Sequence, residues 1–195
     1  MTKTNLRPRS SSKKKIAYAI TILLIIAAVA YAVWSYQQQQ IRNAEIRATG
    51  ALKYSQEQGF ASEFFTNEPQ TEKISLKNID YSTWHAKISV FEIRGPAGFT
   101  KNDVSATRKL YSASGSLVQD FGDMDFTDDG GGYLAYHGIN EDIPAGFEGY
   151  YLITVTFKDT APLGYYTHWM LIDNGVLPTE SYEWQYINNI TLNKG

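Results

Sequence analysis

Residues 16–36 read IAYAITILLIIAAVAYAVWSY and contain no charged side chain. Thr21 is the only strongly polar residue between Ile16 and Trp34. At about 1.5 Å per residue, a helix of this length extends roughly 31 Å, close to the ~30 Å hydrocarbon core of a bilayer. A helix also satisfies its own backbone hydrogen bonds, as lipid requires. The stretch therefore predicts a transmembrane helix over residues 16–36.

A cleaved signal peptide is the main alternative for this stretch. Basic residues precede it, and the small residues at 28–30 or 30–32 would suit a cleavage site. Signal peptides, however, have apolar segments of about 7 to 15 residues, shorter than this one. Trp34 and Tyr36 also lie where aromatic side chains meet lipid headgroups. A buried helix of a soluble protein is a third reading, but such helices rarely lack a polar face over this length.

Charge divides the chain at the apolar stretch. Residues 1–15 carry six basic side chains and no acid, whereas the remaining chain carries 12 basic and 20 acidic residues. Basic flanks stay on the cytoplasmic side of a membrane and attract anionic lipid. The sequence thus predicts a single-pass cell-membrane protein, with residues 1–15 as a cytoplasmic tail and the C-terminal domain extracytoplasmic.

Composition narrows the possible partners and the compartment. The acidic remainder lacks the basic footprint that nucleic acid demands, so we expect no nucleic-acid partner. The chain has no cysteine, so no disulfide or lipidated cysteine is available, and about 125 residues must form a stable core unaided. These features favour a bacterial or archaeal cell envelope over an animal cell surface.

Residues 37–70 are predicted to form a helical stalk and a hinge. Small and apolar side chains recur at three- and four-residue steps from Ile41 to Ser55, although Gly50 interrupts them. Alanines on this stripe would permit self-association through the span or the stalk. Within 59–70, a glycine and an Asn-Glu-Pro turn signal bracket three phenylalanines that we expect to pack on the base of the next domain.

From about residue 71 the hydrophobic pattern alternates, as in β-strands. Eight runs are rich in β-branched and aromatic residues and are separated by Gly, Pro and Asn turn signals. They cover 73–79, 85–94, 104–113, 116–121, 132–137, 149–158, 164–173 and 183–192. A change of phase after Val90 predicts a β-bulge there. Short connections predict an antiparallel β-sandwich over 71–195, immunoglobulin-like or jelly-roll in type, so the whole chain is mainly β.

The acidic run DFGDMDFTDDGGG at residues 120–132 is a candidate metal loop. Calcium takes six to eight oxygen ligands from such loops. The EF-hand pattern fails, because Asp128 occupies the required glycine position and Leu134 the glutamate position. The alternative is an ordinary solvated turn. The candidate calcium ligands are Asp120, Asp123, Asp125, Asp128 and Asp129; no other cofactor is expected.

An aromatic row in the last predicted strand is a candidate ligand- or partner-binding face. Tyr182, Trp184 and Tyr186 alternate with polar residues and therefore share one face. Exposed, such a row suits sugar rings or a protein surface. The alternative, favoured by the polar residues on the opposite face, is that the row belongs to the core.

No catalytic set is visible in the sequence. His85, His137 and His168 are not in metal-ligand spacing, and no Gly-x-Ser-x-Gly nucleophile motif accompanies them. We therefore expect a protein that is not an enzyme.

Two functions remain after these exclusions. The first is a non-enzymatic assembly or interaction subunit of the cell envelope, which engages another envelope protein. The second is a ligand-binding module on the cell surface, for glycan or calcium. Fold alone does not decide between them.

Overall fold

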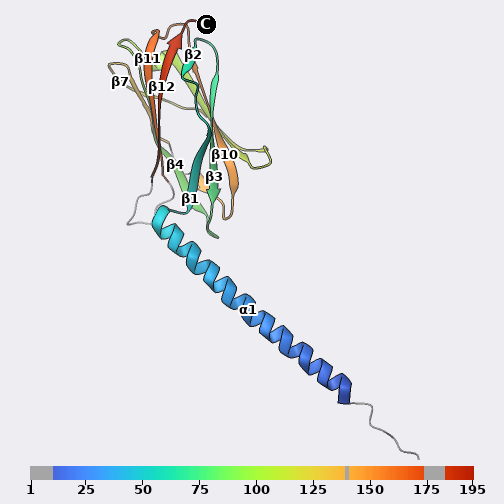
Figure 1. Cartoon of the computed structure of the whole chain (residues 1–195). Helices are drawn as coiled ribbons and strands as arrows, with labels where there is room; N and C mark the ends of the chain where they lie inside the picture. The colour runs from blue at the N-terminus through green and yellow to red at the C-terminus, as the bar shows by residue number, and fades with distance from the viewer. Residues whose placement is uncertain (1–10, 139–140, 174–182) are drawn as a thin grey trace, which may run out of the picture. The chain divides into compact units, whose positions relative to one another are not determined.

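The computed structural model describes residues 11–138, 141–173 and 183–195 (Figure 1). The chain divides into two compact units, residues 1–44 and 45–195.

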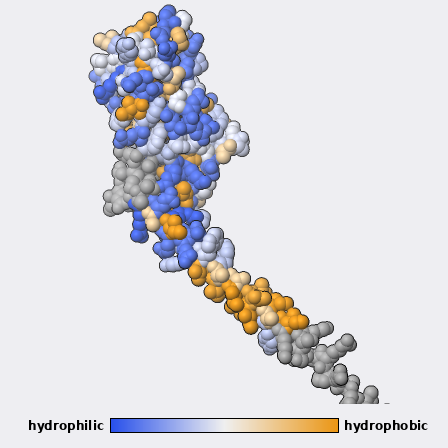
Figure 2. Space-filling model, in the orientation of Figure 1, coloured by the Kyte–Doolittle hydropathy of each residue, from blue (hydrophilic) through white to orange (hydrophobic). Residues whose placement is uncertain are grey.

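The first unit is formed by helix α1 (Ser11–Thr49), whose last residues belong to the second unit. Every residue from 16 to 36 is exposed, and Figure 2 shows the helix surface as predominantly hydrophobic. In the described part of the chain, α1 is the one helix long and apolar enough to cross a membrane. Its length and apolar composition are those of a membrane anchor or of a signal sequence.

The helix ends earlier than the predicted stalk. Gly50 adopts a left-handed φ of 78°, and its N–H donates to the Ile46 carbonyl at 2.9 Å, which closes the helix with a glycine cap. Strand β1 (Leu52–Gln58) follows directly. The prediction of a helix through residue 58 is therefore wrong, because a glycine with φ > 0 ends the helix.

The second unit is a sandwich of two sheets. The first sheet has the order β1, β3 (Gln70–Asn78), β10 (Glu148–Phe157), β5 (Val104–Ser112) and β6 (Leu117–Asp123). The second has the order β2 (Glu63–Phe65), β12 (Glu183–Asn193), β11 (Gly164–Asp173), β4 (Trp84–Arg94), β8 (Tyr133–Tyr136) and β7 (Thr127–Gly130), with β9 (Glu141–Ile143) also paired to β4. A short 3₁₀ helix, η1 (Lys101–Asp103), precedes β5.

The predicted strands are all present, and the mainly β sandwich is confirmed. The bulge is confirmed too: Leu171 faces Val90 and Ile172 faces Ile88, so Ser89 is the extra residue. One pair departs from the antiparallel expectation, because the three residues of β2 run parallel to β12. The core lies between the sheets, where every second residue of β10 from Gly149 to Phe157 is buried.

The sandwich begins near residue 52, not near residue 71. Leu52, Phe60 and Phe64 are all buried in its core. The ring of Phe64 contacts those of Phe60 and Phe157 edge-on, with centroids 5.7 and 5.6 Å apart. The segment predicted to be a hinge is thus part of the core. The edge-on contacts of the Phe64 ring with Phe60 and Phe157 stabilise it there.

A polar clasp holds the end of β12 against the β2 turn. The Thr66 hydroxyl donates to the Asp159 carboxylate at 3.0 Å and accepts from the Gly195 N–H at 3.1 Å. The Lys194 ammonium also contacts Asp159. Lys194 first, and then hydrogen bonds from Asn67 and Thr66, lower the pKa of Asp159 to about 2.

Replacing Phe64 by alanine tests the extent of the sandwich. We expect a loss of about 3–5 kcal/mol in the free energy of unfolding, because the ring is fully buried. Phe65→Ala is the matched control, since Phe65 is only half-buried. Urea denaturation of the unit from residue 45 onward measures both variants. Equal, small losses of stability in both variants would show that residues 59–70 form a hinge outside the core.

The clasp predicts a pH dependence of stability. A carboxyl whose pKa is lowered on folding stabilises the fold above its unfolded pKa of about 3.9, and this contribution is lost as the pH falls toward 2. We expect wild type to exceed Asp159→Asn in urea midpoint at pH 5, and the difference to shrink between pH 4 and pH 2. A difference that stays constant over this range would contradict the assignment.

Candidate functional site

The five aspartates of the predicted metal loop lie along two edge strands and their connection. All five are exposed, and in the described chain no three carboxylate or imidazole groups gather closely enough to hold a metal ion. Asp120 accepts the Gly122 N–H at 2.9 Å and lies 3.1 Å from Lys109 Nζ; these contacts, the Gly122 bond foremost, lower its pKa. Asp128 likewise accepts the Gly130 N–H, at 2.9 Å.

This placement gives the acidic run a structural explanation. Strand β6 is an edge strand of the first sheet, and β7 is an edge strand of the second. Charged side chains on edge strands discourage pairing with another chain. The geometry therefore does not support the calcium hypothesis, and the aspartates fit the role of edge protection.

The predicted aromatic row faces the interior where it is described. Trp184 and Tyr186 pack against the core, with rings stacked at 6.2 Å. Trp184 also lies 6.4 Å from the ring of Tyr54, and Tyr186 lies 5.9 Å from that of His168. Burial raises the pKa of Tyr186. Tyr182 lies outside the described residues. The two described rings are partly buried against the core and do not form an exposed platform.

The histidines have separate surroundings. His85 is exposed and pairs with Asp142 at 2.6 Å, opposite it on β9. The Nδ1 atom of His137 contacts the Ser89 carbonyl at 2.9 Å. Within the described residues, no histidine contacts a serine or threonine hydroxyl, so a serine–histidine pair is not assembled there.

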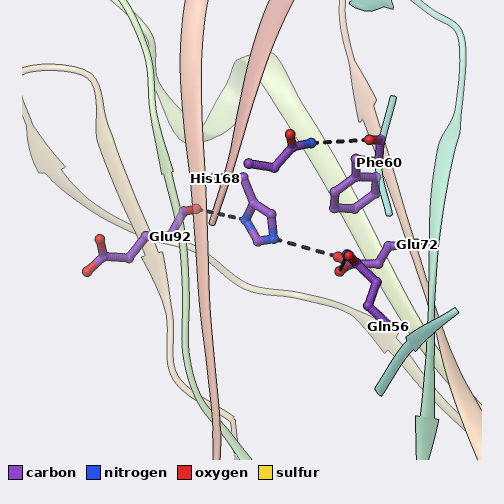
Figure 3. Close-up of polar contacts among 6 residues, drawn as sticks. Gln56, Phe60, Glu72, Glu92 and His168 are labelled. Carbon is purple, nitrogen blue, oxygen red and sulfur yellow. Dashed lines mark hydrogen bonds and ion pairs between the residues drawn. The ribbon is translucent and has the colours of Figure 1, made fainter. Parts of the chain in front are cut away.

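His168 lies inside the sandwich (Figure 3). Its Nδ1 lies 3.1 Å from the Glu92 carbonyl, which only accepts, so Nδ1 carries the hydrogen. The other ring nitrogen, Nε2, faces Glu72 of β3 across the core at 3.7 Å. Gln56 donates to the second oxygen of Glu72 at 2.7 Å. Phe91 covers the imidazole at 4.3 Å between centroids.

Arg108 and Glu141 form a second buried contact between the layers. Arg108 is on β5 of the first sheet, whereas Glu141 is on β9, which pairs with the second. The Tyr151 hydroxyl donates to Glu141 at 2.5 Å. The guanidinium also lies 4.2 Å from the Phe121 ring centroid. Burial raises the pKa of Glu141, with Arg108 and Tyr151 opposing this rise, and it raises that of Tyr151 well above its ordinary value.

The two buried contacts share one level of the first sheet. Ile153 of β10 pairs with Arg108 on one side and with Glu72 on the other. The backbones of Arg108 and Glu72 are therefore two strand spacings apart, roughly 10 Å. Arg108 meets the Glu141 carboxylate, and Glu72 faces the His168 imidazole, each on a strand across the core. No sequence signal identified these residues as partners, because the pairings join strands far apart in the chain.

The outer face of the first sheet carries a hollow of about 460 Å³. Its charged groups are already paired: Lys73 contacts Glu57 at 2.6 Å, and Lys77 contacts Glu148 at 3.3 Å. The Lys73 ammonium also lies 4.2 Å from the ring centroid of Tyr150. Hydrogen bonding between the first pair lowers the pKa of Glu57 and raises that of Lys73.

No protein-family model and no curated protein sequence matches the chain. Among solved structures, it is similar to AvmM, described as catalysing macrocyclization in alchivemycin A biosynthesis, at 10% identity and TM-score 0.48, over 74% of this chain and 90% of that one. A cohesin module of a family 33 glycoside hydrolase from Clostridium perfringens matches at 8% identity and TM-score 0.39, over 74% and 98%. A PapD-like domain of human CEP192 matches at 11% and 0.38, over 75% and 88%.

Breaking the Arg108–Glu141 contact tests whether the buried charges hold the two layers together. We expect Glu141→Leu to cost about 3–5 kcal/mol, because it leaves the guanidinium buried without its counter-charge. The control Glu148→Leu removes an exposed partner of Lys77 and should cost about 0–1 kcal/mol. The double variant Arg108→Met/Glu141→Leu should be more stable than Glu141→Leu alone. Urea unfolding that shows equal losses for Glu141→Leu and Glu148→Leu would refute the interpretation.

Proposed function

We propose that this chain is a single-pass membrane-anchored protein whose extracytoplasmic sandwich is a non-enzymatic assembly or interaction subunit of the cell envelope. The observation that carries the proposal is the apolar helix, exposed at every residue from 16 to 36. Fully burying one large aliphatic side chain stabilises by about 1.5–3 kcal/mol, so the nine Ile, Leu and Val residues of this segment favour lipid strongly. The basic residues before Ile16 orient the N-terminus toward the cytoplasm.

The interior of the sandwich supports the non-enzymatic part of the proposal. Burial raises the pKa of Glu141 and Tyr151, and these two side chains contact each other between the sheets, with Arg108 paired to Glu141. His168 and Glu72 are likewise enclosed, at 1% and 0% exposure of their side chains. Groups held inside a packed core serve its structure, so we assign function to the outer surface.

A ligand-binding module on the cell surface is the second candidate. The five aspartates give it little support for calcium, because they do not converge. The hollows on the outer faces of the sandwich support a glycan ligand.

Membrane extraction and protease accessibility test the anchor. We expect the full chain to stay in the membrane pellet after alkaline carbonate washing, and a variant lacking residues 16–36 to be released. Protease added to intact cells should remove the sandwich and leave the basic N-terminal segment protected. Release of the full chain by carbonate, or protection of the sandwich, would contradict the proposed topology.

Photo-crosslinking in intact cells tests the interaction role. A photoreactive residue at Tyr165, which is 83% exposed, or at Leu117, 53% exposed, samples the outer surface of each sheet. The buried neighbour Tyr166 is the matched control. We expect one discrete crosslinked species of defined mass from an outer position and none from Tyr166. Recovery of the uncrosslinked monomer alone from both outer positions would count against an interaction subunit.

A further inference from the structure

The outer face of the second sheet carries a row that no sequence pattern singled out. Ile187 of β12, Trp169 of β11 and Glu92 of β4 are directly paired neighbours. With Arg94 and Thr167 of the next row they line a hollow of about 350 Å³. Ile187 is 63% exposed although it is aliphatic. The row therefore places an indole and an aliphatic side chain beside a carboxylate.

Glu92 is held in place at this hollow. Its side chain is only 10% exposed, although it belongs to the outer face. The Tyr133 hydroxyl donates to one carboxylate oxygen, and Arg94 Nη2 lies 3.5 Å from the other. Its backbone carbonyl is bound by His168 from inside the sheet, and Figure 3 shows the carboxylate directed away from that imidazole. The Glu92 carboxylate is thus held in position without a ligand.

A second hollow adjoins the first, since both are lined by Arg94. It measures about 430 Å³ and is bordered by Gly131, Gly132 and Tyr133. The Arg94 guanidinium lies 4.8 Å from the Tyr133 ring centroid. Gly132 has a φ of 82°, and a Cβ there would come within 2.6 Å of two backbone carbonyls, so this wall requires glycine. The two hollows form a polar and aromatic groove, defined by Trp169, Ile187, Glu92, Arg94 and Tyr133.

The chemistry of this groove selects a neutral ligand. One carboxylate and one guanidinium cancel in charge, so neither an anion nor a cation gains net attraction. Together they present an acceptor and a fork of donors, which match neighbouring hydroxyl groups that both donate and accept. The rings of Trp169 and Tyr133 offer apolar area to a ligand with both apolar and polar faces. Each hollow is within the usual size range of small-ligand sites.

We propose that the groove binds a neutral oligosaccharide. Sugar hydroxyls bind Glu92 and Arg94, and the C–H face of a ring packs on Trp169. Trp169 and Tyr133 lie on strands that flank β4, roughly 10 Å apart across two strand spacings, so the groove accepts more than one sugar ring. This inference rests on the second candidate function, the glycan-binding module, and adds to it the charge of the ligand and the surface that binds it.

Isothermal titration of the full chain with neutral hexasaccharides tests the proposal. The protein is kept in a detergent without a sugar headgroup, and the probes are cellohexaose, chitohexaose and mannohexaose. We expect saturable binding of at least one probe. Trp169→Ala should weaken it at least tenfold, and Tyr81→Ala, a change of an exposed aromatic residue between β3 and β4, should leave it unchanged.

A second variant keeps the test decisive if Trp169→Ala fails to fold. Ile187→Glu changes an exposed side chain at the same hollow, so it should fold normally and still weaken binding at least tenfold. Absence of saturable binding for all three probes at millimolar concentration would overturn the proposal. Binding that Ile187→Glu and Trp169→Ala leave unchanged would overturn it too. Neither result bears on membrane extraction, so failure here is distinct from failure of the proposed anchor.

Discussion

An apolar helix that the described protein leaves uncovered is the constraint on which this account depends. Residues 16–36 carry no charge and are exposed throughout. Water would penalise each aliphatic side chain by roughly 1.5–3 kcal/mol relative to burial, whereas lipid removes that penalty and leaves the backbone hydrogen bonds of the helix intact. In the proposed topology, the basic residues before the helix keep the N-terminus in the cytoplasm, and the acidic sandwich lies on the opposite side of the membrane.

The ionisable side chains buried in the sandwich are a second constraint on the structure. Glu72, Arg108, Glu141 and His168 lie in its interior, where an isolated charge costs several kcal/mol. Each approaches an opposite or hydrogen-bonding group on a strand of the facing sheet. Such pairs seldom add net stability, but a slipped register would separate them at high cost. We therefore interpret the buried charges as fixing which strands face each other, and this leaves recognition to the outer surface.

The sequence predicts most clearly the strands with long apolar alternation, such as β10 and β11. Four strands were missed for physical reasons. β1 has polar inward residues such as Gln56, and its spacing also fits a helix until Gly50 is recognised as a cap. β2 and β9 have three residues each, and β7 reads Thr-Asp-Asp-Gly with no apolar side chain. Their pairing comes from tertiary contacts, which local periodicity does not contain.

Candidate sites were harder to predict because composition does not say which face of a strand is buried. Trp184 and Tyr186 alternate with polar residues, and they turn inward. Trp169 lies between His168 and Met170, and there the polar-looking histidine is the buried residue while the tryptophan faces outward. The aspartates were predicted to lie in one loop, but four of the five lie on the edge strands β6 and β7, which only the fold defines.

The intact mass and N-terminal sequence of the protein purified from its native membrane show whether the apolar helix anchors it. If the helix is the anchor, the mature chain retains residues 16–36 in full. A mature chain that begins near Tyr31 or Val33 would contradict it, because the apolar helix would have been removed as a signal peptide and the sandwich would be free to diffuse.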